Sequence, residues 1–197
     1  RCDAYDVTGA YPAMASFDFL HFTNPVSWET KNLDYIKSKF YAAYERGNVL
    51  TFCWHYYNPV TGNNFYDTTQ VVKHILPGGS RHETFKSDLK IIADFAHNAK
   101  NHAGELIPII FRPWHEFDGN WFWWGRNHCT VEEFKELYRF TVTYLRDSLQ
   151  VHNFLYAFSS DCGFTTEKEF LERYPGDEYV DVVGMDNYWD FRPDARF

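Results

Sequence analysis

Short apolar runs alternate along the chain with longer segments in which apolar residues recur at helical spacing. Four runs predict strands, at residues 49–54, 107–111, 154–158 and 180–184. A weaker strand is predicted near residues 5–9. Short continuous apolar runs are typical of strands that are buried on both faces of a sheet.

Helical patterns fill the intervals between these strands. Three longer helices are predicted over residues 33–44, 85–99 and 134–149, and a shorter one over residues 167–173. Gly47 stands where a glycine commonly ends a helix. Thr130 and Glu133 match a capping box, in which each side chain satisfies a backbone N–H at the start of a helix.

Strands that alternate with helices predict βα units and a parallel sheet, either a doubly wound open sheet or a (β/α)8 barrel. No G-x-G-x-x-G sequence follows a predicted strand, which disfavours the dinucleotide-binding version of the open sheet. Polar and aromatic residues instead gather directly after the strands, at His55, 112–116, 159–161 and 186–189. Because barrel enzymes carry their chemistry at the carboxyl ends of several strands, this pattern favours the barrel.

Length and charge add mainly exclusions. A chain of 197 residues is expected to form a single domain, and its net charge of −8 argues against a nucleic-acid binder. No apolar run approaches the ~20 residues of a membrane span. The chain begins at Arg1 without a leader pattern, which predicts a processed or trimmed start. Of four widely spaced cysteines, Cys53 lies in an apolar run and is predicted to be a buried thiol, and a disulfide among the others is left open.

Aromatic residues make up 20% of the chain, and many of them fall together. Residues 111–125 read Phe-Arg-Pro-Trp-His-Glu-Phe-Asp-Gly-Asn-Trp-Phe-Trp-Trp-Gly, so seven of these fifteen residues are aromatic. One interpretation is an aromatic core beneath a long loop. We favour a platform on which sugar rings stack, because polar residues are interspersed among the flat aromatic faces.

Glu116 is the candidate catalytic residue of this segment. A carboxyl group among aromatic rings loses hydration, so its pKa rises and it stays protonated near neutral pH. A protonated carboxyl is what the leaving group of a glycosidic bond requires. The alternative is that Glu116 only forms a salt bridge with Arg112. The neighbouring His115 either holds the carboxylate in place or is an ordinary loop residue.

Other polar residues at strand ends carry weaker predictions. His55 follows Trp54, and a structural role is as consistent with its position as a catalytic one. Asp186 ends a later strand and fits a substrate cleft, and Asp161 is either a second carboxylate or a cap. No metal site is predicted, because Gly119 stands where H-E-x-x-H requires its second histidine and no other pattern has zinc-site spacing.

Several stretches together resemble the catalytic domain of glycoside hydrolase family 26, which is best known for endo-β-1,4-mannanases. The matching stretches are residues 8–13, 54–62, 111–116 with 121–125, and 174–177 with 179–188. The tryptophan-rich stretch is the most specific of them. The resemblance implies a (β/α)8 barrel of which about strands 2 to 6 are present, retaining double-displacement chemistry, and no metal or organic cofactor.

The same resemblance implies roles for individual residues. Glu116 is similar to the acid/base at the end of strand four, and His115 to a residue that hydrogen-bonds within the catalytic centre. Tyr188 is similar to the tyrosine that orients the nucleophile. The residues implied to bind the substrate or to support its site are His55, Trp54, Arg112, Trp121, Trp124 and Asp186.

The chain departs from the family pattern at the nucleophile, a Glu at the end of strand seven. No Glu follows Tyr188. We therefore expect residues 1–197 to be a partial catalytic domain, completed by another domain or chain that carries the nucleophile. The predicted function is hydrolysis of internal β-1,4-mannosidic bonds in mannan, at an extracellular, cell-surface or periplasmic location. The alternatives are a non-catalytic carbohydrate-binding remnant, or a relative acting on β-1,3-xylan or mixed-linkage β-glucan.

Overall fold

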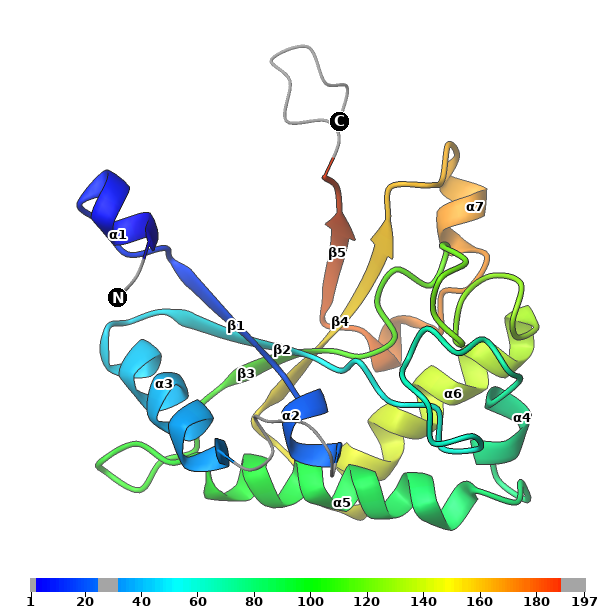
Figure 1. Ribbon diagram of the computed structural model, residues 1–197, viewed down its shortest axis with the longest axis horizontal. Helices are drawn as coiled ribbons and strands as arrows, with labels where there is room; N and C mark the ends of the chain where they lie inside the picture. The colour runs from blue at the N-terminus through cyan, green and yellow to red at the C-terminus, as the bar shows by residue number, and fades with distance from the viewer. Residues whose placement is uncertain (1–2, 25–31, 189–197) are drawn as a thin grey trace.

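A sheet of parallel strands forms the centre of the computed structural model, which describes residues 3–24 and 32–188 (Figure 1). The sheet has the order β1-β2-β3-β4-β5, and each strand is parallel to its neighbours. Its strands are β1 (Met14–Asp18), β2 (Val49–Cys53), β3 (Ile109–Arg112), β4 (Phe154–Asp161) and β5 (Val182–Asp186). Strands that follow one another in chain order, all parallel, are the arrangement found in a barrel wall.

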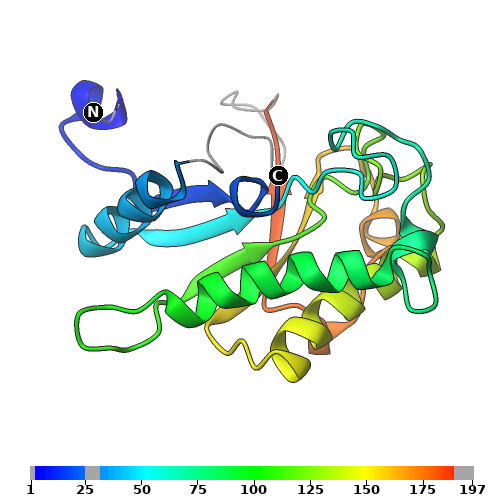
Figure 2. The same cartoon turned by 60° about the horizontal axis from the view of Figure 1, so that its bottom comes forward.

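Helices lie in the connections between these strands. The longer helices are α3 (Leu33–Glu45), α5 (His82–Asn98) and α6 (Val131–Thr143), the last continued by the π-helical turn η2 (Tyr144–Ser148). The shorter ones are α1 (Asp3–Thr8), α2 (Leu20–Thr23), α4 (Val72–Ile75), α7 (Glu167–Leu171) and the 3₁₀ turn η3 (Asp177–Tyr179). Both views show α5 and α6 side by side beneath the sheet (Figures 1 and 2). Within the described residues, none of the helices combines the length and apolar character needed to cross a bilayer.

The two faces of the sheet have different chemistry. On the face toward the helices, Phe52, Phe111 and Phe158 are fully buried in the main hydrophobic core. On the opposite face, the register places Asp18 beside Cys53 and Cys53 beside Arg112, and further along it pairs Asp161 with Asp186. All of these residues lie at the carboxyl ends of their strands. Because the strands are parallel, these ends lie along the same edge of the sheet. Polar side chains from five strands therefore meet at one edge of the sheet.

Four of the five predicted strands are confirmed, with shifted ends, and one prediction is wrong. Residues 3–8 form α1, and the first strand is Met14–Asp18. β3 begins at Ile109 rather than at residue 107, in keeping with the missing N–H of Pro108, which cannot donate to a ladder. β5 begins at Val182 because the turn at residues 177–179 still holds the N–H of Val180.

The predicted long helices are confirmed, and so are two of their end signals. Gly47 has φ +82°, a left-handed conformation that glycine adopts without penalty, and it follows the end of α3. Thr130 and Glu133 form the complete capping box at the start of α6. The third helix is shorter than predicted, because the α-helical pattern ends at Thr143 and η2 covers the next turn.

Candidate active site

Glu116 lies on a loop after β3 whose backbone is held in an uncommon conformation. Trp114 and Glu116 have φ values of 55° and 54°, a left-handed region that costs a side-chain-bearing residue on the order of 1–3 kcal/mol. Tertiary hydrogen bonds hold the loop: the N–H of Glu116 donates to the carbonyl of Ser159 at 2.9 Å, and the indole N–H of Trp124 donates to the carbonyl of His115 at 2.8 Å. The loop thus positions Glu116 beside the end of β4.

The carboxyl group of Glu116 is half-buried and has the electrostatics of a general acid. Burial raises its pKa, and the negative charges of Asp186 and Asp161 raise it further. Two contacts oppose this shift: the indole N–H of Trp121, which donates to Oε2 at 2.8 Å, and the positive charge of Arg112. The net shift is upward, in the direction that the sequence predicts. A larger fraction of Glu116 is therefore protonated near neutral pH than of an ordinary Glu.

Arg112 forms an ion pair across the sheet with Asp186, on the far side of β4. It also donates to Ser159 Oγ at 3.3 Å, and Ser159 in turn donates to Asp186 at 3.1 Å. Both charged side chains are mostly buried, with 24% and 17% of their surfaces exposed. The alternative in which Glu116 serves only as the salt-bridge partner of Arg112 is wrong, because Asp186 occupies that place.

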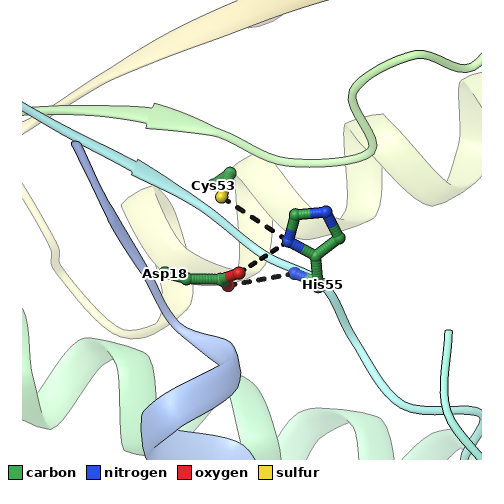
Figure 3. A group of neighbouring side chains, drawn as sticks. All are labelled: Asp18, Cys53 and His55. Carbon is green, nitrogen blue, oxygen red and sulfur yellow. Dashed lines mark hydrogen bonds and ion pairs between the residues drawn. The ribbon is translucent and has the colours of Figure 1, made fainter.

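His55 is held at the opposite end of the polar edge by Asp18 (Figure 3). Its ring Nδ1 lies 2.6 Å from Asp18 Oδ2, and Cys53 Sγ lies 3.7 Å from the same nitrogen. These three ligand-type atoms lie within 4.8 Å of one another, which makes them the group best placed to hold a metal in the described part of the chain. Two ligand atoms on one tetrahedral zinc ion would be about 3.3 Å apart, given bond lengths of about 2.0 Å. The 2.6 Å contact is therefore a hydrogen bond, which accounts for the group without an ion.

His115 lies between His55 and the tryptophan-rich loop. Its ring meets the ring of His55 edge to face at 4.6 Å, and the ring of Phe122 at 5.3 Å. Only 3% of His115 is exposed, and burial lowers its pKa well below the usual range, with the positive charge of Arg112 adding to the effect. His115 is therefore a neutral ring in the wall behind Glu116.

Trp54 and Trp124 were expected to bind the substrate, and the structure corrects this. Both are fully buried, so neither indole face is available to a sugar ring. The Trp54 indole N–H donates to Thr23 Oγ1 at 3.0 Å, and Trp124 stacks on Phe122 at 4.4 Å. Both tryptophans are part of the core beneath the site.

Trp121 and Tyr188 differ from those two tryptophans in being open to solvent. Trp121 is 39% exposed and Tyr188 is 68% exposed. Burial raises the pKa of Tyr188, and the negative charges of Glu116 and Asp186 raise it further. The structure thus brings His55, Arg112, Glu116, Asp186 and Tyr188 to one edge of the sheet.

Comparison with known proteins places the chain in a family. The model of glycosyl hydrolase family 26 matches residues 2–196. The chain belongs to this family. A mannan endo-1,4-beta-mannosidase of Bifidobacterium adolescentis is 44% identical over 193 residues, which is 94% of this chain and 19% of that protein. A mannan endo-1,4-beta-mannosidase of Bacillus subtilis is 28% identical over 195 residues, which is 93% of this chain and 52% of that protein.

Solved structures give the same result for the fold. GH26C from a Muricauda species superposes with a TM-score of 0.91 at 44% identity, covering 97% of this chain and 55% of that one. A modular endo-beta-1,4-mannanase of Cellulomonas fimi superposes with a TM-score of 0.88 at 42% identity, covering 94% and 43%. The chain therefore spans about half the length of these family 26 structures. The predicted barrel fold is confirmed, with five parallel strands in the described residues.

The sequence pattern did not point to two residues near the candidate site, Asp18 and Tyr66. Asp18, the partner of His55, ends β1, and correct placement of that strand would have drawn attention to it by the strand-end rule. Tyr66 is 57% exposed and its ring stacks on Phe122 at 5.6 Å, which extends the aromatic wall next to Trp121. Nothing in the local sequence separates Tyr66 from other loop tyrosines.

Trp121→Phe provides a test of how the indole N–H tunes Glu116. Phenylalanine keeps an aromatic face but removes the N–H that stabilises the charged carboxylate, so the pKa of Glu116 should rise further. If Glu116 acts as a general acid, it does so in its protonated form, and the alkaline limb of kcat/KM should then move to higher pH. The measurement is a pH profile of polysaccharide hydrolysis, made for the variant and for the wild type at the natural length of the protein. An alkaline limb that stays in place or moves to lower pH would contradict the role given to this hydrogen bond.

Proposed function

We propose that this family 26 chain carries the acid/base half of an endo-acting β-1,4-mannanase, and that the protein hydrolyses internal mannosidic bonds with retention of configuration. The observation that carries the proposal is Glu116, half-buried at the carboxyl end of a barrel strand, with a raised pKa and its carboxyl group hydrogen-bonded to an exposed tryptophan. The names of the relatives from Bifidobacterium adolescentis and Bacillus subtilis support mannan as the substrate.

Glu116 would act twice in this reaction. In the first step the protonated carboxyl gives its proton to the glycosidic oxygen as the bond to the leaving sugar breaks, while a second carboxylate attacks the anomeric carbon. In the second step Glu116, now ionised, takes a proton from water as that water displaces the enzyme carboxylate. The two opposing influences on its pKa suit this alternation, because burial favours the acid form while the Trp121 N–H and Arg112 favour the base form.

The second carboxylate is proposed to be a Glu outside residues 1–197. Asp186 is an unsuitable nucleophile, because its Oδ2 already receives hydrogen bonds from Arg112 and from Ser159. Asp161 contributes negative charge near Glu116, and its backbone N–H is held by Asp118 at 2.6 Å. We propose that Asp186 fixes Arg112 in the floor of the site and that Tyr188 orients the incoming nucleophile.

The remaining exposed groups are proposed to bind the sugar chain. Trp121 offers an aromatic face directly beside Glu116, and His55 offers a ring nitrogen at the same edge of the sheet. Stacking on Trp and hydrogen bonding to a ring nitrogen together fix the orientation of a pyranose ring. Because a polymeric substrate cannot cross a membrane, we propose that the protein works outside the cell or at its surface.

Hydrolysis of mannohexaose by the naturally produced protein tests this proposal. We expect cleavage of internal bonds, with the β-anomer of the new reducing end appearing first in ¹H NMR spectra. The α-anomer appearing first would refute the retaining mechanism. Binding of mannohexaose in a calorimeter without any release of reducing sugar would identify a non-catalytic binding protein. Turnover of β-1,3-xylan or mixed-linkage β-glucan in place of mannan would reassign the substrate.

A further inference from the structure

Asp18 uses its two carboxylate oxygens for different tasks. Oδ1 accepts two backbone hydrogen bonds, from the N–H of Leu20 at 2.8 Å and from the N–H of His55 at 3.1 Å. Oδ2 faces the imidazole ring of His55, with 2.6 Å to Nδ1. One oxygen thus ties the start of α2 to the end of β2, while the other faces the ring. The two tasks can be separated by changing a single atom.

The Oδ2 contact decides which ring nitrogen of His55 carries the proton. An ionised carboxylate can only accept hydrogen bonds, so Nδ1 must be the donor. In the neutral imidazole the other nitrogen, Nε2, is then an acceptor. Figure 3 shows this second nitrogen on the side of the ring that points away from Asp18 and Cys53. Within the described residues Nε2 forms no hydrogen bond, and a quarter of the side-chain surface is exposed.

Asp18 stays ionised in this position although it is largely buried. Burial alone would raise its pKa, but the hydrogen bond from the ring of His55, together with those from the backbone N–H groups of Leu20 and His55, outweighs burial and brings the pKa below its ordinary value. The thiol of Cys53 does not compete for this role. Burial raises its pKa, and the charge of Asp18 raises it further, so Cys53 remains a neutral thiol directed at the carbonyl of Phe17.

We propose that Asp18 is a positioning residue that holds His55 in the Nδ1–H tautomer and thereby presents Nε2 as a hydrogen-bond acceptor for a hydroxyl group of the bound sugar. This inference rests on the proposed function for its ligand, and on the structure alone for the tautomer. The rings of Phe65 and Phe122, with centroids 4.7 Å and 5.4 Å from that of His55, restrict the imidazole laterally. Asp18 and these rings together leave the acceptor nitrogen as the free end of the side chain.

Asp18→Asn isolates this role, because asparagine keeps one carbonyl oxygen and replaces the other by an N–H₂ donor. The oxygen is expected to keep the two backbone hydrogen bonds, since the reverse orientation would set the amide N–H₂ against two N–H donors. The amide would then donate to Nδ1 and force His55 into the Nε2–H tautomer. The protein should fold normally, and kcat/KM on mannohexaose should fall by about 10–100-fold, by analogy with the loss of a partner that orients a metal-bound histidine.

The tautomer itself is read from the ¹⁵N shifts of the His55 ring, assigned by comparison with His55→Ala. Wild-type protein should show a protonated Nδ1, and Asp18→Asn a protonated Nε2. In the His55→Ala background, Asp18→Asn should cause no further loss of kcat/KM, because its whole effect passes through the ring. A further loss in that background of the same size as in wild type would show that Asp18 is only structural and would overturn the proposal.

Cys53→Ala serves as the control, since it removes the other neighbour of Nδ1 and leaves Asp18 in place. We expect it to change neither the tautomer nor kcat/KM by more than about twofold. An Nε2–H tautomer in the wild-type protein would overturn the proposal whatever the activity. If wild-type protein has the Nδ1–H tautomer but does not hydrolyse mannan, the proposed function fails while the tautomer assignment stands. The two failures are therefore distinguishable.

Discussion

Glu116→Gln, introduced into the protein at its natural length, is expected to reduce kcat on mannan by about 10²–10⁴-fold, the contribution typical of a positioned general acid. Glutamine keeps an oxygen that can accept the Trp121 N–H, so the loop should stay in place. What it removes is the proton that the leaving sugar needs. The measurement is release of reducing sugar, with thermal unfolding to show that the variant is folded.

The pH dependence makes this prediction more specific. In the wild-type protein kcat/KM should fall as pH rises through the pKa of Glu116, because ionisation removes the acid form. Since burial places that pKa above its ordinary value, the active range extends further toward neutral pH than for an exposed Glu. In Glu116→Gln the residual activity should lack this alkaline limb.

Glu132→Gln is the matched control for Glu116. Glu132 lies in the first turn of α6, and 80% of its side chain is exposed. The same chemical change there should leave both kcat and the pH profile as in wild type. A Glu116→Gln variant with activity within a few-fold of wild type would remove Glu116 from the acid/base role.

Arg112→Met is expected to destabilise the fold by about 3 kcal/mol, the lower end of the range for breaking a buried ion pair by removal of one partner. The loss comes from Asp186, whose side chain is 17% exposed in the ion pair and whose carboxylate would keep only the Ser159 hydroxyl as a described donor. The free energy of unfolding can be measured by urea denaturation at neutral pH. An exposed ion pair would contribute about 0–1 kcal/mol, so the measured loss tells whether the Arg112–Asp186 pair behaves as a buried or as an exposed ion pair.

The double variant Arg112→Met/Asp186→Asn tests the cause of that loss. With the carboxylate neutralised, no unpaired charge remains in the floor of the site, and most of the lost stability should return. A double variant that is no more stable than Arg112→Met would mean that the arginine stabilises by packing rather than by compensating Asp186. Activity should remain low in both variants, because the charge environment of Glu116 is changed in each.

The elements that the sequence predicts correctly are those whose apolar side chains are nearly continuous. β2 and β4 are buried toward the helices, and their sequences are apolar except for Thr51 in β2 and the last three residues of β4. β1 was misplaced because its residues Met-Ala-Ser-Phe-Asp alternate between a partly buried face and an exposed one, so no apolar run marks it. The misplaced strand also concealed Asp18, since a residue can be recognised at a strand end only if the strand is known.

Glu116 was predictable for a different reason. Its aromatic neighbours along the chain are also its neighbours in space, so the local sequence indicates the environment that raises its pKa. The same local reasoning fails for Trp54 and Trp124, which are buried although their sequence neighbours suggested exposure to the sugar. Whether an indole faces the sugar or the core depends on backbone direction over a few residues, and the left-handed conformations of Trp114 and Glu116 cannot be anticipated from composition.

The strained loop after β3 also bears on how such a protein can change through evolution. Of the four consecutive residues from Trp114 to Phe117, only Glu116 is open to solvent, because Trp114, His115 and Phe117 are at most 3% exposed. A substitution at any of the three buried positions is penalised through stability, whatever the protein does. A substitution at 116 is limited by the chemistry of the site and by the left-handed backbone, which disfavours β-branched residues, but it leaves no cavity in the core. A descendant that retained the sugar-binding wall but abandoned hydrolysis would be free to vary at this one position of the four, so the residue found there distinguishes an enzyme from a lectin-like relative.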